Sequence, residues 1–206
     1  MSMGVSTRQP SEIVVDLYER HALAFDSDRG RTAMEQSWLD RLLGLLPANP
    51  TILDTGCGMA EPIAAYLIAR GCKLTGIDSA PSMLALCRER FPKGRWILSD
   101  MRRLELAEKF QGLVVWDSFF HLTQDDQRRM MPIFRAHAAP KAALLFTSGP
   151  RDGIEMGTYR GEPLFHASLA PAEYRSRLAA NGFDVVDFVA DDAECGNHSV
   201  WLAQAR

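Results

Sequence analysis

The sequence lacks the features that mark disulfide-stapled, metal-binding or membrane proteins. It has only four cysteines in 206 residues, none in a C-x-x-C pair, and no histidine stands at metal-ligand spacing from a cysteine. Reduced, mostly buried thiols and no metal site are therefore expected. No apolar run approaches the length of a membrane span, and the N-terminus has no signal-like apolar core. By default, these absences predict a cytoplasmic protein that does not enter a membrane.

An excess of charge of one sign is also absent. The net charge is −3, positive and negative residues are mixed, and no basic block stands out. Nothing in the charge pattern therefore favours nucleic acid or an anionic membrane as a partner. The 47% hydrophobic content excludes a largely disordered chain. The length suggests one domain, predicted over residues 11–206 after a loose, flexible tail over residues 1–10.

Residues 51–61 contain the most informative motif in the sequence. A short apolar run ends in Asp54, and Gly56-Cys57-Gly58, the small residue Ala60 and a helical pattern follow. This order predicts a buried strand that turns sharply into a helix. Glycines there let a ligand approach the main chain closely, and the start of a helix offers free N–H groups. A tight strand–helix turn without any ligand would leave the same pattern.

Two cofactor classes could use this turn. A dinucleotide fingerprint, G-x-G-x-x-G, needs its third glycine at Glu61, where a carboxylate would repel a pyrophosphate. The other pattern has an acid before the glycines and a small residue two after them, as in Asp54, Gly56, Gly58 and Ala60. It resembles motif I of the class I S-adenosylmethionine-dependent methyltransferases, with alanine in place of the third glycine. The resemblance implies that the loop wraps the amino-acid part of the cofactor and that Asp54 helps to hold its ammonium.

Acids at later strand ends extend this resemblance. Asp78 ends the second predicted strand, where an acid is placed to bind both ribose hydroxyls of an adenosine. The resemblance implies that Asp100 accepts from the adenine amine, that Met101 contacts the adenine ring, and that Asp117 lines the methionine end. The expected cofactor is S-adenosyl-L-methionine and the expected product S-adenosyl-L-homocysteine. The predicted cofactor-binding residues are Tyr18, Asp54, Gly56, Cys57, Gly58, Asp78, Ser79, Met83, Asp100, Met101 and Asp117.

Strand and helix patterns alternate from residue 51 onward, which argues for a parallel α/β sheet with helices on both faces. Two final strands joined by a short acidic turn form an antiparallel ending. The resemblance implies a Rossmann-like, mostly parallel, seven-stranded sheet in the order 3-2-1-4-5-7-6, with strand 7 antiparallel. Pro132 is expected to kink or restart the helix that begins at Thr123. Strands are predicted near 51–54, 73–77, 95–98, 112–117, 142–147, 183–189 and 198–205.

Two further segments are predicted to shape the acceptor site. The resemblance implies that leading helices within residues 11–47, near 11–23 and 33–46, cap the cofactor cleft. Tyr18, Phe25 and Trp38 could then line it, although core packing is the favoured interpretation for Trp38. Residues 148–168 show no regular pattern, and so long a loop is often functional, so we expect it to form a substrate loop. The polar stretch 25–32 is expected to be a loop and the acidic turn 191–194 a solvated hairpin tip.

Methyl transfer from a sulfonium is a direct displacement that depends mainly on positioning, and a base is needed only when the acceptor must lose a proton. The candidates for a base are His121, after the fourth strand, His166, in the irregular stretch, and Asp117, for which the methionine end of the cofactor is the favoured place. Either histidine could instead be structural. A small-molecule acceptor and a monomer or homodimer are expected. Three alternatives stay open: a nicotinamide-dependent oxidoreductase, a non-catalytic S-adenosylmethionine-binding module, and another use of that cofactor.

Overall fold

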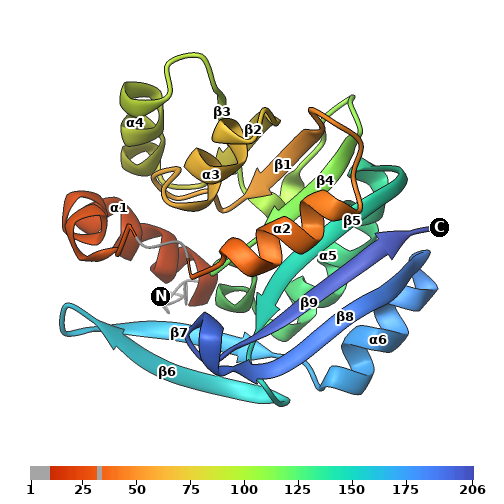
Figure 1. Cartoon of the computed structure of the whole chain (residues 1–206). Coiled ribbons are helices and arrows are strands. Elements are labelled where there is room, and N and C mark those ends of the chain that lie inside the picture. The colour runs from red at the N-terminus through yellow and green to blue at the C-terminus, as the bar shows by residue number, and fades with distance from the viewer. Residues whose placement is uncertain (1–9, 32–33) are drawn as a thin grey trace, which may run out of the picture.

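A seven-stranded sheet runs through the centre of the structure, a computed structural model that describes residues 10–31 and 34–206 (Figure 1). Its order is β3-β2-β1-β4-β5-β9-β8. The first five strands in this order are parallel to one another, whereas β9 is antiparallel to both β5 and β8. The predicted order is therefore confirmed, with β9 as the antiparallel seventh strand. The strands are β1 (Thr51–Thr55), β2 (Lys73–Asp78), β3 (Arg95–Leu98), β4 (Phe110–Val115), β5 (Ala138–Ser148), β8 (Phe183–Asp192) and β9 (His198–Ala205).

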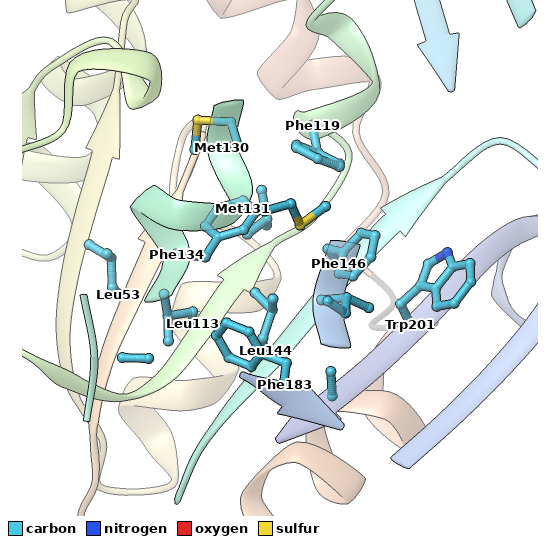
Figure 2. Packing of buried hydrophobic residues seen from close by; sticks show 14 of the residues in the cluster. Leu53, Leu113, Phe119, Met130, Met131, Phe134, Leu144, Phe146, Phe183 and Trp201 are labelled. Atoms are coloured by element: carbon cyan, nitrogen blue, oxygen red, sulfur yellow. The ribbon is translucent and has the colours of Figure 1, made fainter. Parts of the chain in front are cut away.

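Helices cover both faces of the sheet, as predicted. Side chains of α2, α3 and α4 share one buried cluster with one face of the strands, and α5 and α6 share another cluster with the opposite face. Figure 2 shows the second cluster, in which Phe146 of β5 lies parallel to Trp201 of β9 with ring centroids 5.7 Å apart. The helices are α1 (Pro10–Asp28), α2 (Gln36–Gly44), α3 (Ile63–Ala69), α4 (Pro81–Arg90), α5 (Gln124–His137) and α6 (Pro171–Ala180).

Local sequence explains where several helices begin. The hydroxyl of Thr123 accepts a hydrogen bond from the backbone N–H of Asp126 at 3.2 Å and caps α5, as the sequence indicated. Pro81 and Pro171 occupy the first turns of α4 and α6, where a missing N–H costs nothing. Of the two outcomes predicted at Pro132, a kink or a restart of the helix, the restart is wrong, because α5 runs through this residue. Buried side chains of α5 on both sides of this proline pack into one cluster: Met130, Met131 and Phe134.

The N-terminal segment differs from the prediction in two ways. Helix α1 has a kink at His21 and continues beyond it to Asp28, into a stretch predicted as a loop. Polar side chains of this last part have partners: Asp26 pairs with Arg90 and Asp28 with Arg160. Of the two predicted capping helices, only α1 lines the cofactor cleft. Helix α2 packs on the sheet instead, with Trp38 fully buried. Residues 1–9 of the tail predicted over 1–10 and the predicted helix start at residue 33 lie outside the described residues, whereas Pro10 belongs to α1.

The predicted irregular loop over residues 148–168 is instead a regular hairpin. Strands β6 (Gly153–Tyr159) and β7 (Glu162–Ser168) pair antiparallel in a separate two-stranded sheet. The acidic turn agrees with expectation at Asp191 and Glu194, which are exposed, but not at Asp192, which is half-buried and accepts a hydrogen bond from the Trp38 indole N–H at 2.8 Å. In both places a partner distant in the chain supplies the order that the local pattern does not show.

Two other sequence expectations bear on the interior and the surface. All four cysteines are free, with Cys57 half-buried and the other three buried, as predicted. Within residues 10–31 and 34–206, none of the helices combines the length and the apolar character needed to span a membrane.

Candidate functional site

A cavity of about 280 Å³ opens at the carboxyl ends of the central strands. Helix α1 lines it with Val14, Val15, Tyr18 and Phe25. The β6–β7 hairpin lies beside α1 (Figure 1). Every residue predicted to bind the cofactor or to act in catalysis lines this one cavity. They are Tyr18, Asp54, Gly56, Cys57, Gly58, Asp78, Ser79, Met83, Asp100, Met101, Asp117, His121 and His166.

The glycine loop after β1 has the close-packed geometry that its sequence predicted. Gly56 and Gly58 adopt positive φ angles of 75° and 52°, and Ala60 adopts 71°, a conformation that glycine tolerates better than alanine. A Cβ at Gly56 would lie only 2.3 Å from Ser118 Cβ. A Cβ at Gly58 would have no described heavy atom within 4 Å. The main chain at Gly58 is therefore open to the cavity, whereas Gly56 is needed for internal packing.

Asp54, at the end of β1, is a buried acid without a hydrogen-bond donor among the described residues. Its side chain is 3% exposed and lines the cavity. Burial, followed by the charge of Asp78, raises its pKa to about 7. An unpartnered buried carboxylate is costly, and a cation bound in the cavity would lower that cost.

Asp78, at the end of β2, fastens the glycine loop to the next helix. Its carboxylate accepts hydrogen bonds from the backbone N–H groups of Gly58, at 2.9 Å, and Ala80, at 2.8 Å. Burial raises its pKa, although these backbone hydrogen bonds act in the opposite direction. A carboxylate has about four acceptor positions, so lone pairs remain for hydroxyl donors in the cavity.

Asp100, after β3, has a partner that the sequence analysis did not anticipate. Arg102 Nε lies 3.0 Å from both carboxylate oxygens of Asp100, and Arg102 Nη2 lies 2.6 Å from one of them. Burial acts to raise the pKa of Asp100, but the hydrogen bonds and charge of Arg102 outweigh burial and lower it. Met101 begins the short 3₁₀ helix η1 (Met101–Arg103), which places its side chain on the cavity wall.

Asp117, just after β4, joins two cations that sequence reasoning missed. Its backbone has a positive φ of 47°, and its carboxylate lies 3.5 Å from Arg29 Nη1 and 3.0 Å from His198 Nε2. His198 Nδ1 lies 2.8 Å from the carbonyl oxygen of Cys195. Both ring nitrogens face acceptors, so the site favours the imidazolium form, and contact with Asp117 raises the pKa of His198. Arg29 and His198 are far from the motifs in sequence, so no local signal marked either residue.

The two predicted catalytic histidines have different surroundings. His121 Nδ1 lies 2.9 Å from the Phe165 carbonyl oxygen, and its Nε2 lies 3.2 Å from the Tyr18 hydroxyl. The carbonyl requires a proton on Nδ1, so Nε2 accepts from Tyr18, and burial lowers the pKa of His121 to about 4. His166 is half-buried and forms no hydrogen bond with any residue that the structure describes. Burial lowers its pKa, which favours a neutral ring with a free nitrogen.

A second cavity of about 300 Å³ adjoins the first beside the β6–β7 hairpin. Phe120, His166 and His198 line both cavities, so these three rings stand at the junction. Most of the remaining wall comes from the segment that joins β5 to the hairpin. These residues are Ser148, Gly149, Pro150, Arg151, Asp152, Gly153 and Glu155.

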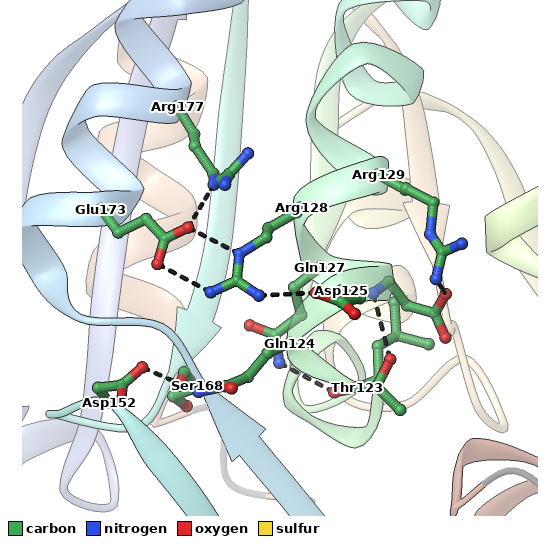
Figure 3. Close-up of polar contacts among 12 residues, drawn as sticks. Thr123, Gln124, Asp125, Gln127, Arg128, Arg129, Asp152, Ser168, Glu173 and Arg177 are labelled. Carbon is green, nitrogen blue, oxygen red and sulfur yellow. Dashed lines mark hydrogen bonds and ion pairs between the residues drawn. The ribbon is translucent and has the colours of Figure 1, made fainter.

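The hairpin is held at both ends. At its base, Gln124 Nε2 donates to Asp152 at 2.9 Å and to the Ser168 carbonyl oxygen at 2.8 Å (Figure 3). At its tip, Arg160 pairs with Asp28 of α1 at 2.7 Å, and Tyr159 donates to the same carboxylate at 2.9 Å. The wall of the second cavity is therefore joined to both α5 and α1.

Comparison with known proteins agrees with the geometry. The family model described as "Methyltransferase domain" matches residues 52–141. The malonyl-[acyl-carrier protein] O-methyltransferase of Serratia marcescens is 29% identical, covering 85% of this chain and 69% of that protein. The trans-aconitate 2-methyltransferase of Variovorax paradoxus is 28% identical, covering 76% of this chain and 54% of the relative.

Solved structures show the same fold at low identity. The magnesium protoporphyrin IX methyltransferase of Synechocystis, with S-adenosylmethionine bound, aligns with a TM-score of 0.74 at 15% identity, covering 98% of this chain and 99% of that one. An amino pentose methyltransferase from Micromonospora echinaspora aligns with a TM-score of 0.69 at 18% identity, covering both chains fully. At such identities the likeness establishes the fold alone.

Proposed function

We propose, on the premise that this chain is a class I S-adenosylmethionine-dependent methyltransferase, that it methylates a small molecule held in the second cavity. The observation that carries this proposal is the junction: Phe120, His166 and His198 line both the predicted cofactor cavity and its neighbour. An acceptor in the second cavity would then meet the cofactor cavity at these rings. The relatives named above have different acceptors, so none of theirs is assigned to this chain.

The residues of the first cavity fit S-adenosylmethionine. Asp54, buried and without a donor, suits the cofactor's ammonium, and the open main chain at Gly58 suits its amino-acid part. Asp78 would accept from the ribose hydroxyls, and Asp100 and Met101 would contact the adenine. When bound, the cofactor supplies a methyl group already activated by a sulfonium charge. A dinucleotide fits less well, because Asp54 would face a phosphate-bearing ligand with an unpaired carboxylate.

Among the histidines, we assign the acceptor-facing role to His166. It lies at the junction and has no described hydrogen-bond partner, so its free nitrogen can bind an acceptor hydroxyl or amine and take its proton. In this geometry His121 positions Tyr18, since the hydroxyl donates to its Nε2. The catalytic role of either histidine stays a prediction. So do the single domain over residues 11–206, the cytoplasmic location and the monomeric or homodimeric state.

Calorimetry of the purified chain tests the cofactor assignment directly. We expect S-adenosylhomocysteine to bind and NADH, at the same concentrations, to give no measurable heat. Release of S-adenosylhomocysteine over a panel of small-molecule acceptors then tests transfer. Preference for NADH would contradict the proposal. Cofactor binding with no turnover on any acceptor would instead favour a non-catalytic binding module.

The affinity for S-adenosylhomocysteine should rise with pH between 6 and 8. The ionised form of Asp54 binds an ammonium, and its pKa in the free protein is raised to about 7. Protonation competes with binding below that pKa, so we expect roughly tenfold weaker binding at pH 6 than at pH 8. Calorimetry at several pH values measures this change, and Asp54→Asn should both weaken binding and flatten the profile. A profile unchanged in the variant would remove Asp54 from the ammonium site.

A further inference from the structure

We infer that the acceptor is a planar aromatic hydroxyl compound, a phenol, which lies against Phe120 with its hydroxyl at His166. The inference rests on the proposed function and names the substrate class of the second cavity. It starts from the three rings at the junction, Phe120, His166 and His198, which line both cavities. Each of these side chains is half-buried, so part of each ring remains open to a guest.

The ring geometry suits a flat guest. The planes of Phe120 and His198 differ by only 16°, with centroids 6.2 Å apart, and His166 lies 5.3 Å from Phe120 at 48°. Because the Phe120 and His198 rings are stacked nearly parallel, a planar molecule that lies parallel to Phe120 is also nearly parallel to His198. The Phe120 side chain is partly exposed where the two cavities meet, and it cannot form hydrogen bonds. An aromatic or apolar ligand would therefore pack against it more favourably than a polar one.

Aromatic side chains continue on both sides of the junction. His121 lies 4.9 Å from His166, and Tyr18 lies 5.6 Å from His121. On the other side, Trp116 lies 6.3 Å from His198. A ring bound at Phe120 would therefore meet further π systems on either side, which adds attraction that a saturated ring of the same size lacks.

The charges near the junction argue against a cationic acceptor. Asp117 is already balanced by His198, at 3.0 Å, and by Arg29, at 3.5 Å. Glu155, on the far wall, pairs with Arg151 at 3.0 Å. Both of these acids are therefore already paired with cations, and Asp152, the other acid in the wall of the second cavity, accepts a hydrogen bond from Gln124 Nε2 at 2.9 Å. His198, whose pKa is raised by contact with Asp117, would repel an ammonium group when protonated. A neutral ring that becomes an oxyanion during the reaction is better matched to this environment.

The chemistry at His166 completes the assignment. The phenol hydroxyl gives its proton to the free nitrogen of the neutral His166. The oxygen lone pair forms a bond to the methyl carbon, and the electron pair of the breaking carbon–sulfur bond stays on sulfur. The products are an aryl methyl ether, S-adenosylhomocysteine and protonated His166, which then returns its proton to solvent. No oxidant, reductant or metal is required.

Paired probes test the inference in protein saturated with S-adenosylhomocysteine. Phenol, catechol and 2-naphthol are each compared with the saturated alcohol of the same skeleton by calorimetry. We expect at least one aromatic probe to bind at least tenfold more tightly than its saturated partner. Phe120→Leu should abolish this preference, because it keeps apolar volume and removes the π face. Val186→Ala, on an exposed position of β8, is the control and should leave the preference intact.

Turnover tests the hydroxyl and His166. With S-adenosylmethionine, the preferred probe should yield its methyl ether, detected by mass, together with S-adenosylhomocysteine. His166→Gln should lower kcat at least tenfold, change KM for the probe less than threefold, and remove the loss of kcat at low pH that protonation of His166 causes.

Two contrary results would contradict the phenol inference and the proposed function separately. If S-adenosylhomocysteine binds but no aromatic probe is preferred, or no methyl ether forms, the phenol inference fails while the proposed function stands. If S-adenosylhomocysteine does not bind, the proposed function fails first and the inference with it.

Discussion

Replacing Asp78 by alanine is expected to weaken S-adenosylhomocysteine binding about thirtyfold. The proposed loss is a buried carboxylate that binds the ribose hydroxyls, which costs about 2 kcal/mol. The substitution also removes the acceptor for the backbone N–H groups of Gly58 and Ala80, so the glycine loop loses an anchor at the same time. Calorimetry of the variant beside the unmodified chain measures the loss.

Two companion variants separate these contributions. Asp78→Asn keeps one oxygen acceptor and should lose less affinity than Asp78→Ala. Asp184→Ala removes an exposed acid paired with Arg206 at 2.8 Å, far from the cavity, and should bind normally. If Asp78→Ala and the unmodified chain bind S-adenosylhomocysteine equally well, Asp78 does not bind the ribose hydroxyls. A fall in the melting temperature large enough to unfold the variant at the assay temperature would be detected by a thermal scan of the same sample.

Replacing each of the two loop glycines by alanine is expected to affect stability and cofactor affinity to different extents. Both have positive φ, so each substitution carries backbone strain of about 1–2 kcal/mol. Gly56→Ala adds a Cβ 2.3 Å from Ser118 Cβ, which should bring its total destabilisation to about 3 kcal/mol. Gly58→Ala adds a Cβ with no described neighbour within 4 Å, so its stability loss should be the smaller.

Cofactor binding should show the reverse order. Gly58 lines the cavity of the proposed cofactor, and its added Cβ would meet no described atom within 4 Å, so a bound ligand can contact it. We therefore expect Gly58→Ala to lower S-adenosylhomocysteine affinity at least tenfold in a folded protein. Urea unfolding and calorimetry on both variants measure the two effects. Similar stability losses for Gly56→Ala and Gly58→Ala would show that close approach to Ser118 is not what requires glycine at position 56.

The sheet and the cofactor cavity were predictable because their signals are local. The run before Asp54, the glycine loop and the acid at Asp78 all place polar groups at the ends of buried strands. Parallel strands bring such ends to one edge whatever the loops between them do. The predicted order of the strands is observed, and the predicted site residues line one cavity.

The acceptor side of the site was not predictable in the same way. Its walls come from segments that meet only after folding. Residues 148–168 showed no clear period, and tertiary contacts such as Gln124 with Asp152 hold them as a hairpin. Helix α2 looked like a cap, but its buried face, with Trp38 at its centre, belongs to the core of the sheet.

The sequence by itself therefore determined the alternating α/β sheet and the acids that surround the cofactor cavity, and its resemblance to a known family implied the strand order. Only the tertiary structure brought Arg29 and His198 to Asp117 and engaged both nitrogens of His121, while those of His166 have no hydrogen-bond partner among the described residues. The physical reason is the range of the interactions. Strands and turns are determined largely by residues close together in the sequence. The charge and protonation state of a side chain depend instead on the groups that pack against it after folding, which can be distant in the sequence.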